Sequence, residues 1–197
     1  MASHDNATEY RRHAPSEELA ADLPAHVVQT LRAQRKTLAT AESCTGGLLA
    51  SYLTAVPGCS QVFGTGVVSY SWDCKRRLLG VRRRTLVMHG AVSRETAGEM
   101  ARGVRRRAGA HLGVALTGEA GPQAAEAKPV GRVYIALADA KQTWVQACQL
   151  DTPDRDREGI RRAAAFCALD MVCRYLEGRP LDENKQTERE NDADTGN

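Results

Sequence analysis

The alternation of short apolar runs with helical patterns constrains this chain more than any other feature of its sequence. Segments between and around the apolar runs repeat apolar residues at helical spacing. Strands that alternate with helices pack in layers, so the sequence predicts an α/β fold. The runs of strand length occupy residues 37–41, 62–70, 112–117, 133–138 and 144–150.

Four helices are expected, and three of them have a side chain that can cap the first turn. Ser16 precedes the first helix and Ser93 precedes the third, whereas the second spans residues 46–56. Thr152 is expected to cap the last helix, with Pro153 at its first position. The buried stripe of this last helix is expected to contain Ile160, Ala164, Cys167, Met171 and Tyr175.

The connection between the last two strands decides the type of sheet. Residues 139–142 are too few for the crossover that parallel neighbours require, so these strands form an antiparallel hairpin. We therefore expect a mixed sheet.

The two ends of the chain differ from its middle. Residues 1–14 are polar and lack periodicity, and residues 179–197 carry six acidic and three basic side chains. Neither segment can bury enough apolar surface to offset its ordering entropy, so both are predicted to be disordered tails. Residues 15–178 remain and are long enough for a single domain with a sizeable core.

Composition disfavours several classes of protein. There is no run of 18 apolar residues and no apolar stretch near the N-terminus, so we expect neither a membrane span nor a secretory signal. The six cysteines show no CxxC pair and no zinc-ligand spacing, so we expect reduced thiols in a cytoplasmic protein without a metal. Aromatic residues make up 5% of the chain, which disfavours a base-stacking platform for single-stranded nucleic acid.

The stretch AESCTGG, from Ala41 to Gly47, carries the most chemistry. It joins an expected strand to an expected helix, and its glycines let the backbone approach a ligand closely. The first amides of the new helix are expected to point outward as donors to an anion. Ser43 lies just before these amides, so it can attack a carbonyl whose oxyanion they hold. Alternatively, Ser43 or Thr45 only caps the helix.

A serine nucleophile needs a base, and a lysine suits this sequence better than a histidine. The five histidines show no spacing that indicates a Ser-His-Asp triad. Lys75 follows the predicted strand 62–70, and burial can lower the pKa of a lysine enough for it to accept a proton. A solvated surface position is the alternative for Lys75. Cys44 is an alternative nucleophile, because a helix N-terminus activates a thiolate. It is less favoured than Ser43, because neighbouring positions cannot both aim at one carbonyl and Lys75 suits a hydroxyl better.

Residues 75–107 are strongly basic. They contain eleven Lys and Arg residues against two Glu residues, a net charge of +9 over 33 residues. Such a segment can bind a nucleic-acid backbone. We favour a solvated, arginine-rich face, because the whole chain carries only +3 and shows no nucleic-acid-binding motif.

Six blocks of the sequence together resemble the CinA C-terminal domain family. In the family's order they are AESCTGGLLASYLTAVPGCS, GVVSYSWDCKRRLLGV, TLVMHGAVSRETAGEMARG, LTGEAGP, KPVGRVYIAL and DREGIRRAAAFCALD. The resemblance covers residues 20–176. It implies a three-layer α/β/α sandwich around a mixed central sheet, in a single domain.

Members of this family are nicotinamide mononucleotide amidases, and the resemblance implies the same activity here. The carboxamide of this small-molecule nucleotide would be hydrolysed to nicotinic acid mononucleotide and ammonia, with no metal or organic cofactor. Ser43 matches the family's nucleophile and Lys75 its general base, and the resemblance also implies a homodimer. The matched substrate-binding positions are Thr45, Gly46, Tyr70, Thr117, Gly118, Arg157 and Arg161, and the fork of donors on Arg161 suits a phosphate.

The sequence departs from the family's pattern in three places. Trp72-Asp73-Cys74 replaces the usual Asn-Glu-Ala before the lysine, and Glu119 replaces an apolar residue. Residues 123–127 form a shorter loop than the family's and contain no glycine. Because this loop borders the pocket in relatives, a catalytically weakened nucleotide-binding or regulatory module is the alternative function. A basic-patch nucleic-acid-binding protein is less favoured.

Overall fold

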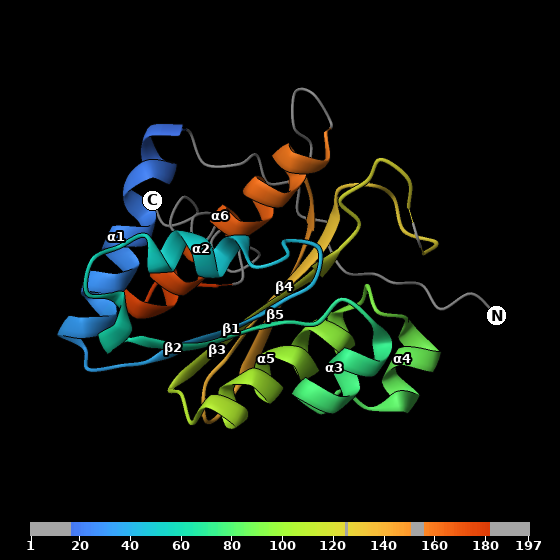
Figure 1. Cartoon of the computed structure of the whole chain (residues 1–197), viewed down its shortest axis with the longest axis horizontal. Helices are drawn as coiled ribbons and strands as arrows, with labels where there is room; N and C mark the ends of the chain where they lie inside the picture. The colour runs from blue at the N-terminus through green and yellow to red at the C-terminus, as the bar shows by residue number, and fades with distance from the viewer. Residues whose placement is uncertain (1–16, 125, 151–155, 182–197) are drawn as a thin grey trace, which may run out of the picture.

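The computed structural model describes residues 17–124, 126–150 and 156–181. A five-stranded sheet lies between two layers of helices, which is the three-layer α/β/α sandwich that was predicted (Figure 1). The predicted caps Ser16 and Thr152, and most of both predicted tails, lie outside the described residues.

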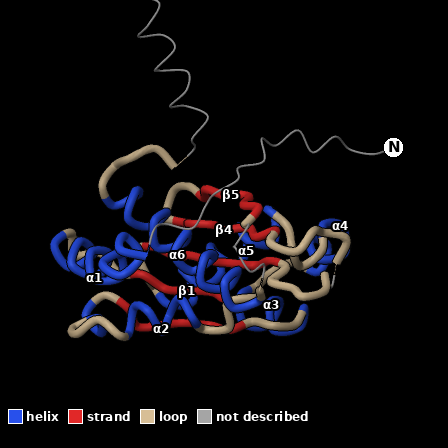
Figure 2. Tube along the Cα trace, turned by 90° about the horizontal axis from the view of Figure 1, so that it is seen from above, coloured by secondary structure: helices blue, strands red, loops and turns tan. Residues whose placement is uncertain are grey.

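The sheet is mixed, as predicted from the short connection between its last two strands. Its strand order is β2-β1-β3-β4-β5, and Figure 2 shows β5 at one edge. The first strand is parallel to both of its neighbours, whereas the third and fourth, and the fourth and fifth, pair antiparallel. The strands are β1 (Leu38–Glu42), β2 (Phe63–Val68), β3 (Leu112–Gly118), β4 (Arg132–Ala138) and β5 (Thr143–Gln149).

The burial of each strand follows from its place in the sheet. All five residues of β1 are buried, because this strand has neighbours on both sides and helices on both faces. The edge strand β2 alternates half-buried and exposed residues, as its alternating sequence predicts.

Three helices cover one face of the sheet: α1 (Glu17–Ala33), α2 (Leu48–Thr54) and α6 (Arg157–Leu176) (Figure 1). Their apolar residues form one core with the side chains of that face. Asp156 caps α6 by accepting a hydrogen bond from the Gly159 N–H (2.8 Å). This helix therefore begins later than Pro153, where it was predicted to begin. Leu181 is buried in the same core, so the packed chain continues past residue 178.

The opposite face is covered by α3 (Trp72–Leu79), α4 (Arg83–His89) and α5 (Arg94–Ala108) (Figure 1). Ser93 caps α5 as predicted, by accepting from the Thr96 N–H (3.2 Å). The sequence pattern did not predict α3 and α4, because each is short and buries only two side chains. So few buried residues give no helical periodicity. None of the helices in the described ranges is long and apolar enough to cross a membrane.

The chain crosses to opposite faces of the sheet after its first two strands. From β1 it enters α2 on one face, and from β2 it enters α3, α4 and α5 on the other before returning as β3 on the far side of β1. In open α/β sheets, ligands bind beside the carboxyl ends of the strands at such a switch point. Residues that follow these three strands are therefore the first place to look for a site.

Gly103 allows α5 to approach the end of α3 closely. A Cβ built at this position would lie 1.9 Å from the carbonyl oxygen of Leu79. That oxygen belongs to the backbone, so it cannot rotate away as the end of a flexible side chain can.

We expect Gly103→Ala to lower the free energy of unfolding by about 3 kcal/mol, because overpacking forces the two helices apart. Gly64→Ala is the matched control, since no heavy atom lies within 4 Å of its Cβ position. It should change stability by less than about 0.5 kcal/mol. Urea denaturation measures both values, and equal losses in the two variants would contradict the close contact.

Candidate active site

The structure brings Ser43 and Lys75 together at the carboxyl end of the parallel strands. Ser43 directly follows β1, and Lys75 lies in the first turn of α3, the helix that follows β2. The Lys75 Nζ lies 2.9 Å from the Ser43 Oγ. A hydroxyl and an amine at this distance can exchange a proton directly.

The amine of Lys75 is buried, which contradicts the alternative of a solvated surface lysine. Its side chain is 1% exposed although it lies on a short polar helix. Burial lowers the pKa of Lys75 from an ordinary value of 10.5 to about 8, and the charges of Cys44, Glu126 and Cys74 oppose this shift. Desolvation therefore favours the neutral amine.

The backbone carbonyl of Ser69 orients the amine. Lys75 Nζ donates a hydrogen bond to this oxygen at 2.6 Å. Ser69 itself is fixed by its N–H, which donates to the carbonyl of Glu42 (2.8 Å). With one hydrogen directed at Ser69, the lone pair of a neutral amine is free to face the hydroxyl of Ser43. Sequence reasoning missed Ser69, and no side-chain signal marks it, because it acts through its carbonyl.

Glu42 occupies the amides that were expected to point outward as anion donors. Its buried carboxylate accepts hydrogen bonds from the N–H groups of Gly47 (3.0 Å), Leu49 (3.1 Å) and Ala50 (2.9 Å). The expectation that the start of α2 is open to a ligand is therefore wrong. A carboxylate is favourable at a helix N-terminus, so an acid at the end of β1 was an available signal.

Cys44 faces the core, on the side of the sheet covered by α1, α2 and α6. It is 5% exposed, and burial raises the pKa of its thiol to about 11. A protonated thiol is a poor nucleophile. These features favour the adjacent Ser43, whose side chain is only half-buried.

Arg161 reaches the loop that carries Ser43 and also forms a surface ion pair. Its Nη2 donates to the carbonyl oxygen of Thr45 (2.8 Å), and its Nη1 pairs with Glu158 (2.7 Å). Gly46 is exposed beside it with a φ of 62°, and a Cβ there would lie 3.5 Å from the guanidinium. The hydroxyl of Thr45 is fully buried and has no hydrogen-bond partner among the described residues.

Arg157 joins two loops at the same end of the sheet. One guanidinium nitrogen donates to the Tyr70 hydroxyl (2.7 Å), and another donates to the Gly121 carbonyl (2.5 Å). Tyr70 follows β2 and is 63% exposed. The first turns of α6 therefore place two guanidiniums beside the segments that follow β1, β2 and β3.

Thr117 and Gly118 lie at the end of β3 and are engaged within the fold. The buried hydroxyl of Thr117 donates to the carbonyl of Ala91 (2.8 Å), in the turn before α5. A Cβ on Gly118 would lie 2.7 Å from the carbonyl oxygen of Arg132, so glycine is needed there for strand pairing. Both residues support the floor of the site.

The shortened loop after β3 is fixed by two carboxylates. Glu126 accepts hydrogen bonds from the N–H groups of Ala91 (2.9 Å) and Val92 (3.1 Å). Glu119 accepts from the backbone N–H of Glu126 (2.9 Å). Two departures from the family pattern, the acid at 119 and the glycine-free loop, are thus physically connected.

One cluster of possible metal ligands exists among the described residues, at the other end of α6. His26, Cys173 and Glu177 place their donor atoms within 4.8 Å of one another. Glu177 accepts from the Cys173 thiol (3.3 Å) and lies 2.8 Å from the His26 ring, and the guanidinium of Arg179 contacts both Glu177 and Cys173. These contacts satisfy the group without an ion, so we assign it to the packing of α1 against α6.

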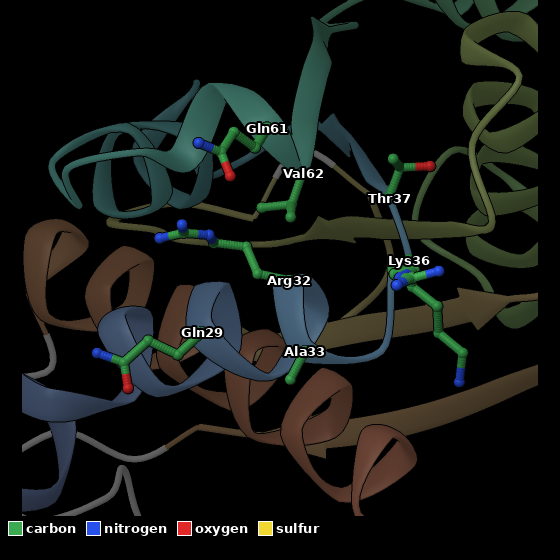
Figure 3. Close-up of a pocket in the computed structure, with 8 residues that line it drawn as sticks. Gln29, Arg32, Ala33, Lys36, Thr37, Gln61 and Val62 are labelled. Carbon is green, nitrogen blue, oxygen red and sulfur yellow. The ribbon is translucent and has the colours of Figure 1, made fainter.

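A surface groove of about 650 Å³ lies at the opposite end of the sheet (Figure 3). Thr37 and Val62, which directly precede β1 and β2, lie on its wall, so it is remote from Ser43. Figure 3 shows the side chain of Arg32 extending from α1 beneath Gln61, while the side chain of Lys36 points away from Gln61. Its lining residues are Gln29, Arg32, Ala33, Arg35, Lys36, Thr37, Gln61 and Val62, which include no nucleophile-and-base pair.

The basic segment 75–107 contributes most of α3, α4 and α5, and some of its charges are paired with acidic side chains. Arg82 forms an ion pair with Glu99, and Arg77 forms one with Asp73. Lys75 is buried in the site, so it does not contribute to a surface patch. The favoured interpretation of a solvated arginine-rich face stays a prediction.

The chain is similar to known proteins over most of its length. The CinA C-terminal domain matches residues 20–176. A CinA-like protein of Desulfovibrio desulfuricans is 47% identical over 161 residues, which cover 81% of this chain and 38% of that protein. This chain spans less than two fifths of the length of such curated relatives, so it corresponds to one part of them.

Solved structures match over nearly their whole length. A CinA superfamily protein from Klebsiella pneumoniae has a TM-score of 0.77 and 35% identity, covering 81% of this chain and 98% of its own. A competence/damage inducible protein from Agrobacterium tumefaciens has a TM-score of 0.75 and 39% identity, covering 80% and 95%.

Lys75 should titrate near pH 8, whereas exposed lysines titrate near 10.4. Heteronuclear NMR of lysine side chains across pH 6 to 11 measures this value, and Lys75→Arg identifies the signal by removing it. Because burial is the main cause, the value should remain low in Ser43→Ala. A Lys75 pKa above about 10 would show that the amine is solvated.

Proposed function

Because this chain belongs to the CinA C-terminal domain family, we propose that its serine–lysine pair hydrolyses the carboxamide of nicotinamide mononucleotide. The products are nicotinic acid mononucleotide and ammonia. The observation that carries the proposal is the 2.9 Å contact between Ser43 Oγ and the buried Nζ of Lys75. This arrangement matches the nucleophile and base that acyl transfer from an amide requires.

In the first half of the reaction, Ser43 Oγ attacks the carboxamide carbon and its proton passes to Lys75 Nζ. The amides of Ser43, Gly46 and Gly47 are hydrogen-bonded within the protein, so they do not hold the oxyanion. The carbon–nitrogen bond then breaks, and Lys75 returns the proton to the departing ammonia. An ester between Ser43 and the nicotinoyl group remains.

In the second half, water attacks this ester while Lys75 accepts a proton from the water. The tetrahedral intermediate collapses, Ser43 takes the proton back, and nicotinic acid mononucleotide leaves. Lys75 must be neutral to begin either half. Since burial lowers its pKa to about 8, the neutral fraction and the rate both rise as pH increases through that value.

The phosphate of the substrate is assigned to the guanidiniums of α6. Arg161 contacts the Ser43 loop and Arg157 contacts Tyr70, so both border the same end of the sheet. A phosphate monoester carries nearly two negative charges, which the planar donor fork of arginine recognises.

A catalytically weakened nucleotide-binding module is supported less well. It was motivated by the loop without glycine, and that loop is held in place by hydrogen bonds to Glu119 and Glu126. Burial of the Lys75 amine destabilises its charged form. A general base needs such an amine, whereas a binding module has no use for it.

Purified protein incubated with nicotinamide mononucleotide should release ammonia and nicotinic acid mononucleotide in equal amounts. Ser43→Ala should reduce the rate at least about a thousandfold, because the nucleophile is lost. Lys75→Arg should be as inactive as Lys75→Ala, because a guanidinium keeps the charge but cannot give up a proton. Chromatography and an ammonia assay measure both products.

Cys44→Ser serves as the matched control for the nucleophile and should have a mild effect, because the thiol faces the core. Near-normal turnover in Ser43→Ala would make the nucleophile assignment wrong. Near-normal turnover in Lys75→Arg would show that Lys75 acts only through its charge.

Arg161→Ala should weaken use of the mononucleotide about ten- to a hundredfold, the range expected for one charge-assisted hydrogen bond. The effect on nicotinamide riboside, which lacks the phosphate, should be smaller. Steady-state kinetics on both substrates give the comparison. An equal, small loss on both would mean that Arg161 only pairs with Glu158 on the helix surface.

A further inference from the structure

We propose that Glu126 is a specificity-determining residue that favours amides carried on a cationic ring. The inference rests on the proposed amidase function and adds the charge of the group that bears the amide. It starts from the loop after β3, where this sequence departs most from its family pattern.

Glu126 is held in one place by contacts on both sides of its side chain. Its carboxylate accepts hydrogen bonds from two successive amides, those of Ala91 and Val92. A Cβ at Gly90 would lie 2.5 Å from the Glu126 Oε2, so the glycine lets the carboxylate approach this turn. Glu119 anchors the backbone N–H of Glu126 itself. A side chain fixed in this way presents its charge at a defined position.

That position is close to the reacting groups. The turn that binds Glu126 is joined to the end of β3, because Thr117 donates to the Ala91 carbonyl (2.8 Å). Ser43 is joined to the same strand end, because its backbone N–H donates to the Leu116 carbonyl (3.1 Å). The charge of Glu126 also opposes the lowering of the Lys75 pKa. Glu126 is half-buried, and two amide contacts use only part of the accepting capacity of a carboxylate.

Charges of opposite sign are therefore separated across the site. A carboxylate lies toward Lys75, and two guanidiniums lie toward the start of α6, where Arg157 and Arg161 contact Tyr70 and Thr45. A matching ligand has a positive charge next to its reacting amide and a negative charge farther away. A pyridinium carboxamide joined through ribose to a phosphate has this distribution.

An uncharged ring of the same shape would lose the attraction to Glu126 but keep every other contact. The test therefore compares nicotinamide mononucleotide with the 5′-phosphate of benzamide C-riboside, which has the same carboxamide, sugar and phosphate on a neutral ring. The measured quantity is the ratio of the two kcat/KM values. Differences in intrinsic amide reactivity cancel when this ratio is compared between variants.

Glu126→Gln should lower the ratio about tenfold, the size expected for one charge pair at a partly exposed site. Glu126→Asp keeps the charge and should retain most of the preference. Glu95→Gln removes a half-exposed acid from the first turn of α5 and should leave the ratio unchanged. Rising salt should lower the ratio in the wild-type protein, because it screens a partly exposed charge, and this measurement needs no variant.

Equal losses on both substrates in Glu126→Gln would show that Glu126 only holds the loop, and would overturn the proposal. A wild-type ratio that does not respond to salt, together with an unchanged ratio in Glu126→Gln, would also overturn it. In both cases the wild-type protein still releases ammonia from nicotinamide mononucleotide, so the proposed function stands. If the wild-type protein releases none from either substrate, both proposals fail together.

Discussion

The site depends on the burial of one amine. Lys75 can act on Ser43 as a base because its side chain is removed from water. The carbonyl of Ser69 then supplies the one hydrogen-bond acceptor that fixes the direction of the amine. Burial thus converts a side chain that is usually charged into one that can take a proton near neutral pH.

Carboxylates organise the backbone around this amine. Glu42 binds the start of α2, and Glu126 binds the turn before α5. Glu119 binds the backbone N–H of Glu126, in the loop after β3. The site is therefore held by side chain-to-backbone hydrogen bonds, whereas the two cores on either side of the sheet hold the layers together.

The strands and the long helices could be predicted because they repeat apolar residues over many positions, and the pairing of Ser43 with Lys75 was expected from family resemblance. Short helices such as α3 could not be predicted, because only Lys75 and Leu79 are buried in it and one of them is a lysine. The partners of Glu126 were also out of reach. A sequence identifies a carboxylate but not the amides, thirty-five residues away, that it will contact.

The order in which the site is assembled follows from where its parts lie in the chain. Ser43 and Lys75 belong to the first 75 residues, whereas Arg157 and Arg161 begin the last helix. During synthesis the nucleophile emerges well before α6, which brings the guanidiniums to the loops after β1 and β2. A nascent chain therefore carries the serine before the guanidiniums are in place. The complete site forms only when the C-terminal helix docks.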